Sequence, residues 1–316
     1  MRDVSAKPNT LRSAVASCTL IAAPATIRAI RKGTVPKADP VGVAKIAGIQ
    51  AAKQTALLIP YCHQVPVDFV RVDISLGAGS LEIRAEVKAV WKTGVEMEAL
   101  VAVTAAALTL YDMLKIIDDG MEIRSARLIG KQGGVSSTTR SAAGLTAAVL
   151  VTSDSVSEKF TEDLSGKYLA DQLGSLGFTV RHYAVVPDEQ WEIERTLLSW
   201  CESPGLDLIL TTGGTGVGPR DVTPDATSNV ITRRLDGVEE TFRAYGQNRI
   251  PTAMLSRGVA GVRGRTVIIN LPGSIRGAED AVRSLFPAVL HAFPMLRGEG
   301  HGGRKIRSRT RRRAGK

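Results

Sequence analysis

The sequence has few aromatic residues, histidines and cysteines. Aromatic side chains make up 4% of the 316 residues, and there are four histidines and three cysteines. Three cysteines spread far apart along a chain form neither a disulfide framework nor a zinc cluster. So few rings also leave little surface for stacking on nucleic-acid bases. The composition therefore argues against disulfide-stabilised, zinc-binding and base-stacking proteins.

Long hydrophobic runs are also absent. The uncharged apolar run of residues 99 to 111 is too short to span a bilayer, and no cationic apolar leader stands at the start of the sequence. We therefore expect a cytoplasmic protein with no membrane partner. With 44% apolar and 23% charged residues the chain is globular, and its length suffices for two ordinary domains.

The net charge of +10 is concentrated at the end of the chain. Residues 304 to 316 carry eight lysines or arginines and no acid, which leaves the rest of the chain near +2. A run of this kind is typical of a solvated, disordered tail, which we place at residues 299 to 316. Nucleic-acid binding by this tail is the less favoured alternative.

The first part of the chain has the pattern of an α+β domain. Asp39 and Pro40 predict the start of a helix that runs to Leu58, since aspartate is a good N-cap and proline suits the first helical position. Alternating residues predict a hairpin, and a mostly apolar stretch predicts a buried second helix. Hairpin strands between two helices indicate a split βαβ sandwich. The expected strands are 70 to 76, 81 to 91 and 121 to 129, and the second helix is 95 to 117.

A glycine-rich polar stretch follows, and then the pattern changes. We predict a domain over residues 1 to 134, a linker over 135 to 145 and a second domain over 146 to 298. Strands and helices alternate in the second domain at the spacing of a doubly wound, three-layer α/β fold with a mostly parallel sheet. The expected strands are 147 to 152, 179 to 185, 206 to 210 and 265 to 270, with helices at 166 to 176 and 189 to 201 and a final helix, broken by prolines, at 278 to 296.

The second domain contains a glycine- and threonine-rich stretch, residues 211 to 227, directly after an expected strand. Its bare backbone amides could hold an anion, although it matches neither the P-loop nor the dinucleotide fingerprint. A simple turn is the alternative. Arg220, Asp221 and the separate Asp188 add a cation and carboxylates near such a cradle, and the carboxylates could bind magnesium. Asp188 could instead cap a helix.

The first domain contains polar residues that an apolar pattern does not require. Asp112 and Lys115 are three apart on a helix, so they share a face and could form an acid/base pair. A surface ion pair is the alternative. His63 has no companion ligands at metal spacing, which favours a substrate contact. The other polar residues at such positions are Tyr61, Cys62, Glu96 and Glu98.

Five motifs within residues 1 to 134 resemble the MoaC family of cyclic pyranopterin monophosphate synthases: Asp3-Val-Ser-Ala-Lys7, residues 45 to 53, residues 58 to 63, residues 93 to 100 and residues 107 to 115. The resemblance implies a ferredoxin-like hexamer that converts a cyclic dihydro-GTP triphosphate to cyclic pyranopterin monophosphate and diphosphate, with no tightly bound cofactor. It places the acid/base on Asp112 with catalytic Lys37 and Lys115. Arg12, Lys45 and Lys53 would bind the triphosphate, and Tyr61, Cys62, His63, Met97 and Glu98 would contact substrate.

Six motifs from about residue 146 to 298 resemble the MoaB/MogA family of molybdopterin adenylyltransferases: residues 152 to 155, 163 to 166, 186 to 188, 211 to 227, 251 to 257 and 270 to 274. The resemblance implies a trimeric α/β fold that transfers AMP from ATP to molybdopterin with Mg²⁺. The implied catalytic and magnesium-binding residues are Asp188 and Asp221. The implied substrate contacts are Ser153, Asp154, Gly213, Gly214, Thr215, Gly216, Pro272, Gly273 and Ser274.

Together the resemblances predict a bifunctional enzyme of molybdenum cofactor biosynthesis that forms a homotrimer or homohexamer, with other enzymes of that biosynthesis as further candidate partners. The alternative is an active synthase fused to a domain that only binds molybdopterin. Two positions depart from the MoaC pattern: Ala38 replaces the usual glycine, and Val135 replaces the usual lysine.

Overall fold

The computed structural model describes residues 1 to 134 and 141 to 299, and the chain divides into two compact units, Met1–Ser137 and Thr138–Lys316. Each unit is described by itself. Val135, most of the expected linker and almost all of the expected basic tail lie outside the described residues.

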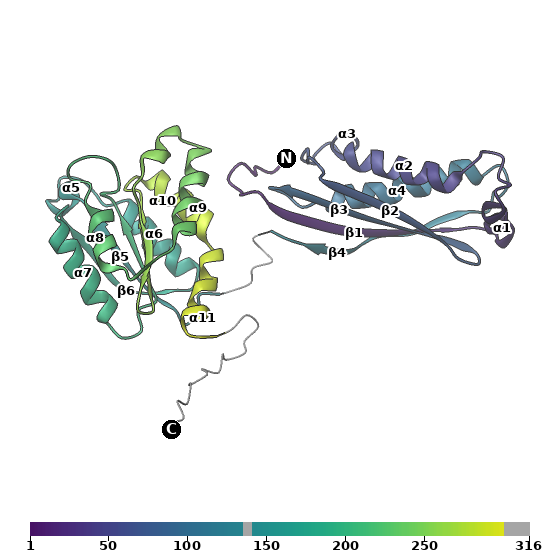
Figure 1. The fold of residues 1–316 in the computed structure, drawn as a ribbon. Coiled ribbons are helices and arrows are strands. Elements are labelled where there is room, and N and C mark those ends of the chain that lie inside the picture. Colours follow the sequence, from purple (N-terminus) through teal and green to yellow (C-terminus); the bar gives the residue numbers. More distant parts are fainter. Residues whose placement is uncertain (135–140, 300–316) are drawn as a thin grey trace, which may run out of the picture. The chain divides into compact units, whose positions relative to one another are not determined.

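Unit 1 is a four-stranded antiparallel sheet with helices on one face (Figure 1). The strand order is β2-β3-β1-β4, with β1 paired to both β3 and β4. This arrangement confirms the predicted ferredoxin-like, split βαβ fold. The strands are β1 (Thr10–Ile21), β2 (Phe69–Leu76), β3 (Ser80–Trp91) and β4 (Glu122–Gln132).

The two long helices of unit 1 pack on each other over the sheet (Figure 1). Asp39 caps the first of them by accepting a hydrogen bond from the Gly42 amide at 2.9 Å, as predicted. The prediction of one helix to Leu58 was wrong, because the chain breaks at Gln54 into two helices. The helices are α1 (Pro24–Lys32), α2 (Pro40–Lys53), α3 (Thr55–Leu58) and α4 (Glu96–Leu114).

Helix α4 is long and apolar enough to cross a membrane by length and composition alone. Most of its alanines, together with Val103 and Leu110, are instead buried against α2 and the sheet, which confirms the predicted buried helix. The apolar character of α4 is therefore explained by the core of unit 1.

Unit 2 has a six-stranded sheet in the order β6-β5-β7-β10-β9-β8. The first four strands are parallel, whereas β9 and β8 are antiparallel and were not predicted. The predicted mostly parallel α/β fold is confirmed. The strands are β5 (Thr146–Thr152), β6 (Thr179–Val186), β7 (Leu208–Thr212), β8 (Arg233–Arg234), β9 (Ala260–Arg263) and β10 (Thr266–Leu271).

Helices cover both faces of this sheet (Figure 1), and alternate residues of its strands enter two separate cores. Val149 and Leu210 belong to one core, and Leu150 and Ile209 to the other. The sheet is therefore buried on both faces, as parallel sheets are. The helices are α5 (Asp154–Ser157), α6 (Ser165–Ser175), α7 (Gln190–Glu202), α8 (Thr223–Val230), α9 (Asp236–Gln247), η2 (Pro251–Leu255), α10 (Ile275–Leu285), η3 (Ala288–His291) and α11 (Ala292–Leu296).

Candidate functional site

The carboxyl ends of the parallel strands of unit 2 surround a polar pocket of about 510 Å³. The loops that follow β5, β6, β7 and β10 all contribute to its lining, which is where α/β sheets bind ligands. The predicted site residues Ser153, Asp188, Gly213, Gly214, Asp221 and Gly273 are among the residues that line it. The glycine-rich loop and the carboxylates of Asp188 and Asp221 therefore line the same pocket.

The turn after β7 requires glycine at two successive positions. Gly213 has φ 107° and Gly214 has φ 56°, in the left-handed region that side chains disfavour. A Cβ at Gly213 would overlap the carbonyl oxygen of Thr152, and one at Gly214 would lie 2.9 Å from Oδ1 of Asp188. The backbone therefore passes close to the carboxylate, and no side chain separates the two.

Buried hydroxyl and amide groups hold this turn in place. Asn270 is completely buried; its Nδ2 donates to the hydroxyls of Thr211 at 2.9 Å and Thr227 at 2.8 Å. The Thr212 hydroxyl donates to the carbonyl of Pro272 at 2.9 Å. A Cβ at Gly273 would lie 3.1 Å from Cα of Gly213, so the turns after β7 and β10 touch. Asn270 is a structural tie between two strands and a helix.

Asp154 and Asp188 hold each other across the ends of β5 and β6. The amide of Asp188 donates to Oδ1 of Asp154 at 2.9 Å, and the amide of Asp154 donates to Oδ2 of Asp188 at 3.1 Å. Burial raises the pKa of Asp188, with the neighbouring carboxylates adding to the effect. Its Oδ1 is buried and has no hydrogen-bond partner among the described residues.

Asp221 follows the same glycine-rich loop. Its Oδ2 accepts a hydrogen bond from the Gly218 amide at 2.7 Å, so its carboxylate closes a tight turn of its own loop. Arg257 donates to the Asp221 carbonyl and forms an ion pair with Asp225 at 2.9 Å. The side chain of Asp221 is half-buried at the pocket wall.

The donor set of this pocket fits magnesium bound together with a phosphorylated ligand. The unpartnered Oδ1 of Asp188 and the carboxylate of Asp221 are hard oxygen ligands. No group of three or more metal-ligating side chains occurs among residues 1 to 134 and 141 to 299. Magnesium held here would therefore draw its remaining ligands from phosphate oxygens and water, as it does in many nucleotide sites.

A second hollow of about 280 Å³ lies on the other side of the glycine-rich loop. Thr215, Gly216, Pro272 and Ser274 line it, so these predicted residues face a different hollow from Gly213 and Gly214. Its wall also includes apolar side chains, among them Phe242, Ile250 and Leu255. The loop thus separates a polar pocket from one with apolar walls.

In unit 1, Asp112 lies between two lysines at the end of α4. Its carboxylate forms ion pairs with Lys37 at 3.0 Å and Lys115 at 2.7 Å. Hydrogen bonds from the two lysines lower the pKa of Asp112 to about 2, and the bond to Asp112 raises the pKa of Lys115. All three side chains are largely exposed. In this arrangement the Asp112 carboxylate is ionised and lies between the ammonium groups of Lys37 and Lys115.

A second group of predicted residues lies at the start of α4. Sγ of Cys62 is 3.9 Å from Oε1 of Glu98, which is buried, and burial raises the pKa of both groups. Nε2 of His63 is 2.7 Å from the carbonyl of Arg2. Arg12 lines a polar pocket of about 280 Å³ with Glu96 and Lys131. Of the remaining predictions, Lys53, Tyr61 and Met97 are exposed, and Lys45 is half-buried.

The two groups of unit 1 do not meet within one chain. Glu98 and Asp112 are both on α4, and a rise of 1.5 Å per residue separates their Cα atoms by roughly 21 Å along the helix axis. The separation of Glu98 and Asp112 could have been calculated from the sequence, since both residues lie in one predicted helix. Within one copy of unit 1, the two groups therefore lie near opposite ends of α4.

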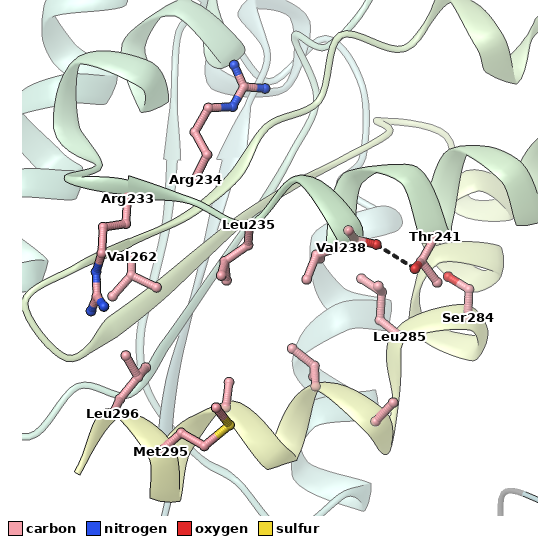
Figure 2. A pocket seen from close by; sticks show the side chains of 14 residues that line it. Arg233, Arg234, Leu235, Val238, Thr241, Val262, Ser284, Leu285, Met295 and Leu296 are labelled. Atoms are coloured by element: carbon pink, nitrogen blue, oxygen red, sulfur yellow. Dashed lines mark hydrogen bonds between the residues drawn. The ribbon is translucent and has the colours of Figure 1, made fainter. Parts of the chain in front are cut away.

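Another cavity of unit 2, about 600 Å³, lies between α9 and the C-terminal helices (Figure 2). Its labelled wall residues include Leu235, Val238 and Leu285, and Arg234 is directed away from it. Arg234 is paired with Glu239 at 2.7 Å. Because none of its lining residues comes from the loops that follow β5, β6, β7 and β10, this cavity is not the candidate site.

Both halves of the chain match known families. Residues 1–134 match the MoaC family, and residues 148–291 match a probable molybdopterin binding domain. The molybdenum cofactor biosynthesis bifunctional protein of Chlorobaculum tepidum is 47% identical over 301 residues, with 95% of this chain and 96% of that protein covered. The cyclic pyranopterin monophosphate synthase of Thermomicrobium roseum is 51% identical over 142 residues, covering 44% of this chain and 86% of the relative. The crystal structure of MoaB from Thermus thermophilus is 42% identical and covers 49% of this chain and 97% of that chain, with a TM-score of 0.47.

Proposed function

Because this chain belongs to the family of bifunctional molybdenum cofactor biosynthesis proteins, we propose that its two units catalyse two different steps of that biosynthesis. Unit 1 converts a cyclic dihydro-GTP triphosphate to cyclic pyranopterin monophosphate and diphosphate. Unit 2 transfers AMP from ATP to the phosphate of molybdopterin. The observation that carries the second assignment is the strand-end pocket, in which glycine-rich backbone and two carboxylates converge.

The loop between two hollows suits a reaction that joins two phosphorylated molecules. In the transfer, a phosphate oxygen of molybdopterin attacks the α-phosphorus of ATP, the bond to the β-phosphate breaks, and diphosphate leaves. Such chemistry depends on placement and charge more than on covalent participation of the protein. The backbone amide of Gly214 orients a phosphate in the polar pocket, and the apolar wall beside Thr215 accommodates a flat ring.

Asp188 and Asp221 hold magnesium in this proposal. The support for Asp188 is its buried, unpartnered Oδ1, which lies against the glycine turn and gains a partner when a cation is present. Bound magnesium neutralises part of the triphosphate charge. The two carboxylates would fix the position of the magnesium charge, and the surrounding loops would hold the nucleotide next to these carboxylates.

Unit 1 acts as an oligomer in which neighbouring copies complete each other's site. This proposal rests on the separation of the Asp112 group from the group around Cys62, Glu98 and Arg12. In a closed symmetric assembly, one end of α4 can meet the other end from a second copy. The lysines beside Asp112 then supply positive charge and protons for ring opening and reclosure, while Arg12 binds phosphate. A homotrimer or homohexamer serves both units.

Product assays on the purified full chain test the function directly. We expect it to release diphosphate and cyclic pyranopterin monophosphate from the cyclic triphosphate, and to form adenylylated molybdopterin from molybdopterin, ATP and Mg²⁺. Asp112→Ala should abolish only the first activity and Asp221→Ala only the second. If molybdopterin binds but no adenylylated product forms with Mg²⁺ present, unit 2 is a binding domain, and the transferase assignment is wrong.

A further inference from the structure

Arg220 connects three loops of the strand-end site. Its Nε and Nη2 donate to the two carboxylate oxygens of Asp154 at 3.0 and 2.9 Å, and its Nη1 donates to Glu189 at 2.8 Å. Arg220 comes from the loop after β7, Asp154 follows β5, and Glu189 follows β6. A planar guanidinium that binds one carboxylate through two hydrogen bonds fixes its orientation as well as its charge.

The contact with Arg220 continues to Asp188. Oδ1 of Asp154, which accepts from Arg220, also accepts from the Asp188 amide, and the Asp154 amide donates to Oδ2 of Asp188. This leaves Oδ1 of Asp188 beside Gly214. Resting on the function proposed above, we propose that Arg220 is a positioning residue that holds Asp188 in its catalytic orientation through Asp154.

Two observations favour positioning over direct phosphate binding by Arg220. Three of the five guanidinium N–H groups, one on each nitrogen, already donate to Asp154 and Glu189, so these carboxylates fix how the guanidinium is oriented. Arg220 also balances the charge of Asp154 and Glu189, next to Asp188 and Asp221. Without it, like charges would push Asp154 and Asp188 apart.

The test combines AMP transfer by the full chain with calorimetric binding of α,β-methylene-ATP at varied Mg²⁺. We expect Arg220→Ala to lower kcat about 10- to 100-fold and to raise the Mg²⁺ concentration for half-maximal analogue binding by a similar factor. Loss of a residue that orients a metal ligand typically has an effect of this size. KM for ATP, and analogue affinity at saturating Mg²⁺, should change less than about threefold by the same argument. Arg220→Lys should recover part of the loss.

Three further variants separate this role from others. Asp154→Asn combined with Arg220→Ala should be no worse than the more damaging single change, because both act on the same contact. Glu189→Gln, which removes only the charge of the outer partner and keeps an acceptor oxygen, and Arg195→Ala, an exposed arginine on α7, should retain wild-type values.

If Arg220→Ala lowers the analogue affinity equally at every Mg²⁺ concentration, Arg220 binds phosphate directly, and the inference is wrong. It is also wrong if the effects of Asp154→Asn and Arg220→Ala on kcat add up, or if Arg220→Ala needs no more Mg²⁺ than the wild type. In each of these cases the wild-type chain still transfers AMP. A wild-type chain that neither transfers AMP nor binds the analogue with Mg²⁺ would instead overturn the proposed function of unit 2.

Discussion

The two units gather their candidate residues in different ways. In unit 2, loops from four neighbouring parallel strands end at the same edge, so residues distant in sequence line one pocket. In unit 1, two groups of candidates lie near the two ends of one long helix, α4, on an antiparallel sheet. In the functions proposed above, the parallel sheet therefore builds a complete site within one chain, whereas the sandwich needs a second copy.

The strongest test of this comparison mixes inactive variants. Asp112→Ala and Arg12→Ala should each lower synthase activity by about 10²- to 10⁴-fold, the usual contribution of acid/base groups and well-placed charges. When the two variants are unfolded together and refolded as mixed oligomers, about a quarter of the sites should be intact if each site joins two copies. Synthase activity of the mixture, relative to each variant alone, is the measurement.

Unit 2 provides the matched control for that mixture. Asp188→Asn and Asp221→Asn should each lower AMP transfer, but a mixture of the two should recover nothing, because both side chains line the same pocket of the same chain. Recovery in unit 2, or its absence in unit 1, would remove the proposed difference between the units.

The next effect concerns the glycine turn of unit 2. Gly214→Ala should lower AMP transfer and reduce the free energy of unfolding by about 1–3 kcal/mol, since the new methyl meets Asp188 and the left-handed backbone strains a side chain. Gly174→Ala, on α6 with no atom near its Cβ position, should instead stabilise by about 0.5–1 kcal/mol. Unfolding curves and transfer assays measure both. Equal behaviour of the two variants would contradict the close approach at Gly214.

The sequence missed strands in both units, for different physical reasons. Strongly apolar strands such as β5 and β7 are unmistakable, whereas β1, the central strand of unit 1, was missed. Its buried residues Ala14, Ala16 and Cys18 are small, so the alternation is weak although its period is correct. The short antiparallel strands β8 and β9 were missed because two to four residues carry little pattern.

Site prediction from sequence was limited in a different way. Motifs identified residues of unit 2 that the fold brings to two neighbouring hollows, yet Arg220, in the middle of its motif, was noted only as a nearby cation. Its partners, Asp154 and Glu189, are far away in sequence, so the network that it organises follows only from the sheet. In unit 1, the burial of Glu98 and the distance from Asp112 required the packing of α4.

The pH response of Asp112 tests the exposed ion-pair cluster of unit 1. The lysines lower its pKa from 3.8 to about 2, so the ionised pair contributes to stability above pH 4, and this contribution is lost as the pH falls toward 2. In Lys115→Ala, the pKa of Asp112 should rise toward 3.8, because the largest hydrogen bond is gone. Carboxyl NMR titration of both proteins measures it, with Lys167→Ala of unit 2 as a control. A pKa that stays near 2 in Lys115→Ala would mean that Lys37 alone sets it.

The smallest effect should come from Ala38, where this chain departs from the usual glycine of its family. Ala38 has φ 54°, so a left-handed conformation is imposed on a residue with a side chain, between Lys37 and the helix cap Asp39. The left-handed region costs an alanine about 1–2 kcal/mol, while glycine loses roughly 0.5–1 kcal/mol through greater chain entropy. Ala38→Gly should therefore stabilise unit 1 by about 0.5 kcal/mol in denaturant unfolding, whereas Ala105→Gly within α4 should destabilise it by about 1 kcal/mol. If Ala38→Gly also destabilises unit 1, the loop that carries Lys37 is not strained. Left-handed backbone beside charged groups would then be a feature of unit 2 and not of unit 1.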